Sequence, residues 1–110
     1  MPAAVGGWVI NAIWRLNSYY RKNLNTSFFR LDNGAEVDLV IQTHDHKVFG
    51  IEIKSGENPQ VSGLLTGFEA LEKEISLTAK ICFAPITRQY VDRGVHFMPV
   101  SQLAQFIKGL

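Results

Sequence analysis

Apolar positions recur along this 110-residue chain with two different periods, and each period predicts a kind of element. From about residue 4 to residue 24 the apolar residues follow the i, i+3, i+4 spacing of a helix with one buried face. That face comprises Val5, Trp8, Val9, Ala12, Ile13, Leu16, Tyr19 and Tyr20. Ile10 and Trp14 fall outside it, so we expect a second contact surface, made by another element of this chain or by a partner.

The middle of the chain alternates apolar and polar residues with the period of two that is typical of strands. Three strands are predicted there, at residues 26–31, 35–43 and 47–55. The turn signal "DNG" separates the first two, and "HDH" joins the second to the third. After them we predict a helix at 62–75 capped by Ser62, strands at 78–86 and 94–100, and a helix at 101–110.

This order of elements, αβββαβ followed by a short strand and a helix, predicts one α/β domain over residues 1–110 with a mixed central sheet flanked by helices. The composition is 46% hydrophobic and 19% charged, which suits a packed core. The net charge of +1 gives no general attraction to nucleic acid or membrane. Every charged side chain before Asp32 is basic, however, which favours a polyanionic partner for this segment.

The two middle strands carry acidic and basic residues on one side. Period-two alternation places Glu36, Asp38 and Val40 on one face of "EVDLVI", with Val37, Leu39 and Ile41 on the other. In "GIEIKSG" the same rule places Glu52 and Lys54 on one face. If the two strands pair as an antiparallel hairpin, all of these charged groups converge at one edge of the sheet. The alternative is that Glu52 and Lys54 form an exposed salt bridge.

Converging carboxylates repel one another unless a cation lies between them. We therefore expect Asp38 and Glu52, with a backbone carbonyl, to hold a hard divalent ion such as Mg²⁺. Lys54 lies on the same face, where an ammonium group positions water or stabilises negative charge on a phosphate.

The phrases "GAEVDLVI" and "GIEIKSG", set in this order of elements, resemble the PD-(D/E)XK nuclease superfamily, which has the restriction-endonuclease-like fold. In particular they look like the nuclease-like domain at the C-terminus of a group of prokaryotic AAA-type ATPases. The resemblance covers about residues 5–83. It implies phosphodiester hydrolysis of nucleic acid with Mg²⁺ or Mn²⁺, with DNA the expected substrate and RNA the alternative.

The resemblance also assigns roles to residues. Asp38 matches the metal-binding aspartate, Glu52 the second acidic ligand and Lys54 the catalytic lysine, while Glu36 matches an assisting acid. Members of the superfamily commonly carry a glutamate in the first helix, and this chain has no acid before Asp32. The resemblance also suggests that Gln60 contacts the substrate. Independently of it, Arg15, Arg21, Lys22 and Arg30 are expected to contact a nucleic-acid backbone, and the alternative is that they form a solvated helix flank.

A second hypothesis is a catalytically inactive nuclease-like module that keeps the sheet for binding. The chain lacks the Gly-rich phosphate loop of an ATPase, so we expect a module detached from that portion. Its first helix then provides a contact with the ATPase portion or with a second copy, through Trp8, Ile10 and Trp14.

The remaining residues give simpler expectations. Cys82 lies in an apolar run, which predicts a buried thiol in a reducing compartment. No run is long enough to span a membrane, and we expect a cytoplasmic protein. His44 and His46 are expected to be solvated turn residues rather than metal ligands.

Overall fold

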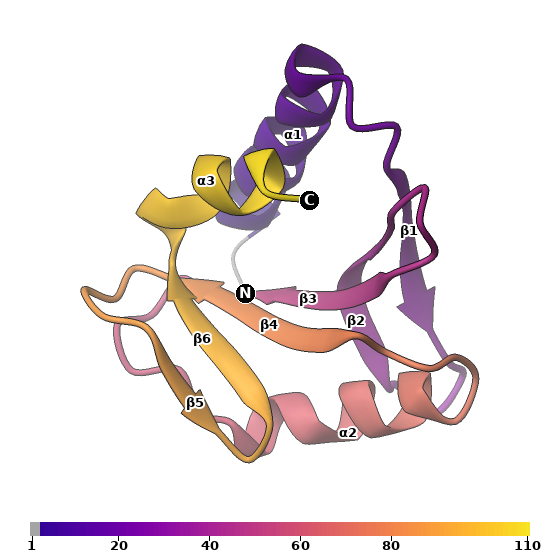
Figure 1. Cartoon of the computed structure of the whole chain (residues 1–110). Coiled ribbons are helices and arrows are strands. Elements are labelled where there is room, and N and C mark those ends of the chain that lie inside the picture. Colours follow the sequence, from indigo (N-terminus) through magenta and orange to yellow (C-terminus); the bar gives the residue numbers. More distant parts are fainter. Residues whose placement is uncertain (1–2) are drawn as a thin grey trace.

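The computed structural model describes residues 3–110 and contains one mixed sheet with helices on both faces (Figure 1). The helical elements are α1 (Ala3–Tyr20), α2 (Ser62–Glu72), the 3₁₀ turn η1 (Val100–Gln102) and α3 (Leu103–Lys108). The strands are β1 (Asn25–Arg30), β2 (Glu36–Gln42), β3 (Val48–Ile53), β4 (Ala79–Ala84), β5 (Tyr90–Asp92) and β6 (Val95–Pro99).

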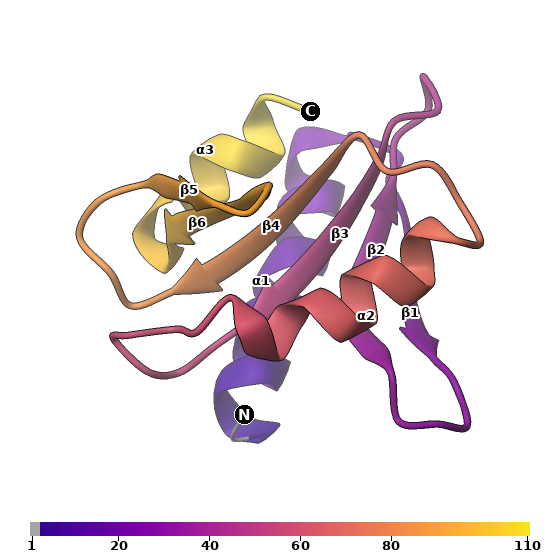
Figure 2. The same ribbon diagram turned by 90° about the horizontal axis from the view of Figure 1, so that it is seen from below.

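The strand order is β1-β2-β3-β4-β6-β5. The first three strands form an antiparallel meander, β4 lies parallel to β3 and to β6, and β5 is antiparallel to β6. The connection from β3 to β4 contains α2, as a parallel pair requires (Figure 2). Because β3, β4 and β6 run in one direction, their carboxyl ends at Ile53, Ala84 and Pro99 lie along the same edge. The predicted mixed α/β sheet flanked by helices is therefore confirmed.

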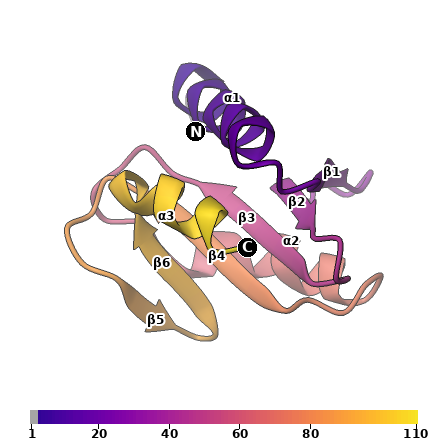
Figure 3. The same cartoon turned by 45° about the horizontal axis from the view of Figure 1, so that its top comes forward.

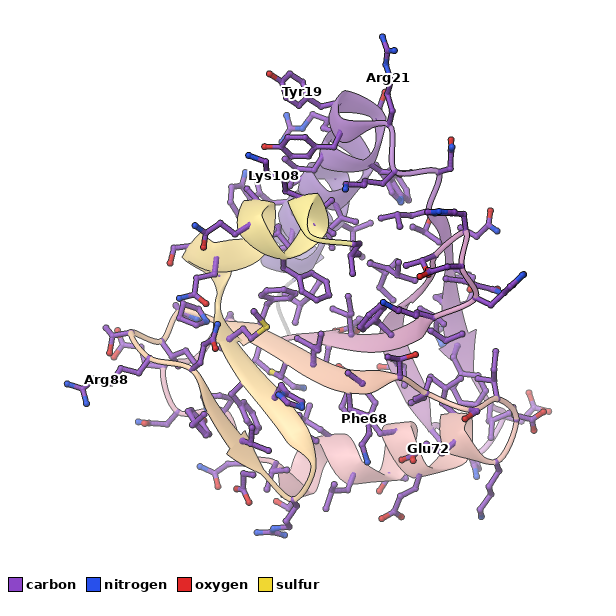
Figure 4. The ribbon with its side chains drawn as sticks, viewed as in Figure 1. Tyr19, Arg21, Phe68, Glu72, Arg88 and Lys108 are labelled. Carbon is purple, nitrogen blue, oxygen red and sulfur yellow. The ribbon has the colours of Figure 1, made fainter. Side chains whose placement is uncertain are left out.

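A separate apolar core lies on each face of the sheet. Figure 3 shows α1 and α3 together on one face and α2 on the other. The first core consists of Val9, Ile13, Leu24, Leu39, Ile41, Phe49, Ile51, Ile53, Ile81, Phe83, Leu103 and Ile107. The second core, beneath α2, consists of Val37, Val61, Leu64, Phe68, Leu71, Cys82, Val95 and Phe97. Figure 4 shows Phe68 pointing from α2 into the sheet.

The first helix ends earlier than the sequence predicts. α1 stops at Tyr20, because Arg21 and Asn23 adopt left-handed backbone conformations with φ of 52° and 55°. The side chain of Asn17 then binds both backbone groups of Leu24, donating to its carbonyl at 3.3 Å and accepting from its amide at 2.9 Å. Apolar periodicity continued through Leu24, but these polar contacts end the helix.

The buried face of α1 is narrower than predicted. Val9 and Ile13 are fully buried, whereas Trp8 and Tyr19, which were assigned to that face, are 59% and 79% exposed. Ile10, which was assigned outside it, packs on the first core, and α3 packs against α1. The side chain of Val5 lies outside the described part of the chain.

Four smaller features also differ from the prediction. The strand β5 was not predicted, and α2 ends at Glu72 rather than at residue 75. Ser62 is the first helical residue of α2, and Val61 precedes it without a side-chain cap. The closing helix begins only at Leu103, after η1.

Two simpler expectations can be compared directly with the structure. Cys82 is a free thiol with no exposed surface, as predicted. No helix within residues 3–110 is long and apolar enough to cross a membrane.

Candidate functional site

A cleft of about 300 Å³ opens where β3 ends, between the β1–β2 turn and the first half of α2. The residues lining it are Asn33, Gly34, Ala35, Glu36, Glu52, Lys54, Gly63, Thr66 and Gly67. Three of the four predicted catalytic residues, Glu36, Glu52 and Lys54, thus share one cavity. In parallel sheets, the carboxyl end of a strand is the usual place for a ligand.

The fourth predicted residue, Asp38, lies beside Glu52. The β2–β3 register pairs Leu39 with Ile51, so Asp38 stands one position further on, level with Glu52. Its Oδ2 atom accepts a hydrogen bond from the backbone N–H of Ile53 at 2.9 Å. The Asp38 carboxylate therefore accepts the hydrogen bond that a backbone carbonyl of β2 would otherwise accept at this end of the β2–β3 pair. This hydrogen bond fixes the position of the carboxylate.

A β-bulge in β2 determines which face of the sheet the side chains at the start of this strand occupy. Against β1, the register changes from Ser27 opposite Val40 to Phe29 opposite Val37, so β2 has one residue more than β1 there. As a result Val37 packs in the core under α2, while Leu39 packs in the core on the other face. Period-two alternation had placed both on one face, and for Val37 that prediction is wrong.

Glu52 is a buried carboxyl group, with 6% of its surface exposed. Its pKa is raised from 4.5 to about 8, first by burial, then by the negative charge of Asp38 and a hydrogen bond between the two carboxyl groups. The positive charge of Lys54 opposes this rise without cancelling it. The carboxyl group of Glu52 is therefore mostly protonated near neutral pH.

Lys54 follows the last residue of β3. Its backbone N–H donates to the carbonyl of Phe83 at 2.9 Å, which ties it to the end of β4. Its side chain is half-buried and lines the cleft. Within residues 3–110 no ion pair joins Lys54 to Glu52. The alternative of an exposed salt bridge is wrong, because Glu52 is buried.

Glu36 reaches the same cleft from the start of β2, but it is exposed and has a partner. Arg30 forms an ion pair with it at 3.2 Å. Arg30, a predicted nucleic-acid contact, therefore lies beside the cleft, and its guanidinium group is paired with Glu36, a predicted catalytic residue.

A glycine allows α2 to approach this part of the sheet closely. A Cβ atom at Gly67 would collide with the backbone carbonyl of Glu36, whereas one at Gly63 would meet no atom within 4 Å. Gly67 is thus the contact point between α2 and β2 at the cleft. Asn33 and Thr66 also line the cleft. The sequence predicts Asn33 only as a turn residue, and no motif identifies Thr66 as part of a site.

Gln60 lies close to the cleft, whereas three of the predicted basic contacts do not. A neighbouring cavity of about 430 Å³ is lined by both Lys54 and Gln60, and the Gln60 amide donates to the carbonyl of Asn58 at 3.3 Å. The remaining three, Arg15, Arg21 and Lys22, belong to α1 or directly follow it, and α1 packs on the opposite face of the sheet (Figure 3).

The donor set in this cleft is small. Across residues 3–110, no group of three or more His, Cys, Asp or Glu side chains converges as a metal site. Asp38 and Glu52 are the two carboxyl groups that lie side by side at this end of the sheet. Two adjacent carboxyl groups suit a hard cation such as Mg²⁺, because a divalent ion relieves the repulsion by Asp38 that, after burial, raises the pKa of Glu52. His44 and His46 are exposed in the β2–β3 turn, as expected.

These features define a mixed α/β domain with a paired-carboxylate cleft at the edge where its parallel strands end. The chain belongs to the family described as "Domain of unknown function (DUF4143)", which matches residues 3–103. This family is often found with AAA-type ATPases. No curated protein and no solved structure matches the chain.

Proposed function

We propose that this domain has a restriction-endonuclease-like core and hydrolyses phosphodiester bonds in nucleic acid, with DNA as the expected substrate. The meander β1–β2–β3 followed by the α2 crossover to a parallel β4 is compatible with that core. The phrases "GAEVDLVI" and "GIEIKSG" fall on β2 and β3, so that the resemblance and the cleft concern the same residues.

The observation that carries the proposal is the burial of Glu52 against Asp38, with Lys54 lining the same cleft. A domain gains no stability from burying a carboxyl group whose pKa it must raise to about 8. Strongly perturbed ionisable groups in a cleft are typical of functional sites. Binding of a cation by both carboxylates would explain why the two groups lie together despite this cost.

This proposal assigns a role to each residue of the site. Asp38 and Glu52 hold Mg²⁺ or Mn²⁺, and Ile53 fixes the Asp38 carboxylate through its backbone N–H. Bound metal would lower the pKa of a coordinated water and neutralise charge on the phosphate. Lys54 orients the attacking water or stabilises the developing negative charge. Glu36 assists from the rim, where Arg30 holds it.

A nuclease assay tests this function. Wild-type protein is incubated with Mg²⁺ and with mixed single- and double-stranded DNA, beside Asp38→Asn and Asp45→Asn. The second variant is the matched control, since Asp45 is a carboxylate in the turn at the other end of the same hairpin. We expect cleavage by the wild type and by Asp45→Asn, and loss in Asp38→Asn. Equal cleavage by all three proteins contradicts the proposal.

A second candidate function is a non-catalytic module that contacts an ATPase portion or a second copy. Two observations favour it: the lack of a third acidic ligand within residues 3–110, and the exposure of Trp8 and Trp14 on α1. Calorimetry separates the two functions, because the module should bind no divalent ion at millimolar concentration. Light scattering tests the second copy, and a monomer at high concentration contradicts it.

A further inference from the structure

One row of side chains crosses the sheet from the carboxylate cleft to the opposite edge strand. Glu52 pairs with Cys82, Cys82 with Phe97, and Phe97 with Tyr90. Directly paired residues in neighbouring strands project from the same face of a sheet. Glu52 and Tyr90 therefore belong to the face that α2 covers in part, three strand spacings apart, which is about 14 Å.

Tyr90, at the end of this row, has an aromatic ring in a fixed position. The ring lies parallel to that of Phe97, with the centroids 4.7 Å apart and an angle of 10° between the planes. Phe97 is buried, whereas Tyr90 is 42% exposed. A ring that is supported from below and exposed above is suited to stack on a planar ligand at little cost in conformational entropy.

A cavity of about 430 Å³ adjoins Tyr90, and its lining includes Glu57, Asn58 and Arg88. A third cavity lies between it and the cleft and shares lining residues with both. Asn58 also lines the cavity that contains Gln60, and that cavity shares Lys54 with the cleft. Three neighbouring hollows therefore lie in series between Glu52, the loop after β3 and the ring of Tyr90.

Arg88 supplies positive charge at this far end. Its side chain is exposed and projects away from the sheet in Figure 4. No carboxylate in the described part of the chain forms an ion pair with it. Glu57 contributes a negative charge to the same cavity. A phosphate is therefore expected on the Arg88 side rather than beside Glu57.

We propose that Tyr90 and Arg88 form a second contact site for the nucleic acid, in which an unpaired base stacks on Tyr90 and Arg88 holds a flanking phosphate. This inference rests on the proposed function and specifies its substrate as single-stranded nucleic acid, or a duplex with an unpaired end. The distance from Glu52 to Tyr90 corresponds to about four stacked nucleotides of one strand.

Binding without cleavage tests the site. Fluorescence anisotropy is measured in EDTA with labelled single-stranded DNA of about 12 nucleotides and with the matching duplex. Tyr90→Leu should weaken single-strand binding about tenfold and leave duplex binding unchanged, while Tyr90→Phe, which keeps the ring, should bind as the wild type does. Arg88→Gln should reduce the steepness of the salt dependence of binding, measured as the slope of log K against log salt concentration, by about 0.7.

The matched control is Lys108→Gln, which removes one positive charge from α3 on the other face and should bind as the wild type does. Three results overturn the inference: wild-type affinity in both Tyr90→Leu and Arg88→Gln, equal weakening by Lys108→Gln, or equal loss of duplex binding in Tyr90→Leu. Thermal melting followed by circular dichroism is the check that each variant is folded.

The two proposals fail separately. If the wild type cleaves nothing, but Tyr90→Leu loses single-strand binding, the contact site stands and the nuclease activity does not. If the wild type cleaves DNA and Asp38→Asn does not, while Tyr90→Leu and Arg88→Gln bind as the wild type does, the nuclease stands and the contact site is wrong.

Discussion

Glu52 should make the stability of this domain decrease as pH rises, which is unusual for a carboxyl group. Its pKa is about 8 in the folded chain, against 4.5 as its ordinary value, so the folded state binds a proton more tightly than the unfolded state does. Between these two pH values the free energy of unfolding falls as pH rises. Below pH 4.5 the carboxyl group is protonated in both states, and its full favourable contribution is present.

The size of the effect follows from the shift. Each pH unit between the two pKa values removes about 1.4 kcal/mol, so the whole window corresponds to a loss of about 4 to 5 kcal/mol. Single domains have about 5 to 15 kcal/mol of stability in total. The titration of this one group should therefore be visible in ordinary unfolding experiments.

The assay compares the wild type with Glu52→Gln by urea unfolding in EDTA at pH values from about 5 to about 9. Glutamine keeps the shape of the side chain and can still donate to Asp38, but it does not ionise. All other groups titrate in both proteins, so the difference between the two free energies isolates Glu52. We expect the variant to gain stability relative to the wild type by several kcal/mol as pH rises through the window.

A constant difference between the two proteins from about pH 5 to about pH 9 would contradict this reasoning. It would mean that Glu52 titrates normally in the folded chain, and hence that its burial against Asp38 is wrong. The same result would remove the observation that carries the proposed metal site.

Three further predictions concern the same cleft and its support. At pH 8 and without nucleic acid, millimolar Mg²⁺ should raise the melting temperature of the wild type but not of Asp38→Asn, because the ion binds the folded carboxylate pair; an equal rise in both contradicts the assignment. Gly67→Ala should cost about 1 to 3 kcal/mol, because the added Cβ meets the carbonyl of Glu36, while the control Gly63→Ala should cost nothing; equal costs by urea unfolding would show that α2 does not pack there. Asn17→Ala should lower stability by about 1 to 2 kcal/mol through its lost bonds to Leu24, and an unchanged thermal melt would contradict the role of those bonds.

The strands and the carboxylate pair could be predicted because their signals are local. Alternation in "EVDLVI" and "GIEIKSG" fixes the two strands, and the antiparallel hairpin then places Asp38 level with Glu52. The extra residue of β2 opposite β1 could not be predicted in this way. It depends on pairing between two strands, and it reverses the face of Val37.

Other features could not be predicted because hydrophobic periodicity does not report on them. β5 has three residues, too few for a period to be recognised. The end of α1 depends on left-handed conformations at Arg21 and Asn23, which apolar spacing does not report. The face on which the basic residues near the amino end lie could not be predicted either, because composition does not say on which face of a sheet a helix packs.

Cys82 lies between Glu52 and Phe97 in the row that crosses the sheet, and it provides a built-in reporter. Burial and the neighbouring carboxyl group raise the pKa of its thiol to about 12, so the reactive thiolate hardly forms in the folded chain. Alkylation by iodoacetamide therefore requires that the core beneath α2 opens. Its rate, followed by mass spectrometry, measures how often the core between α2 and the sheet opens next to Glu52.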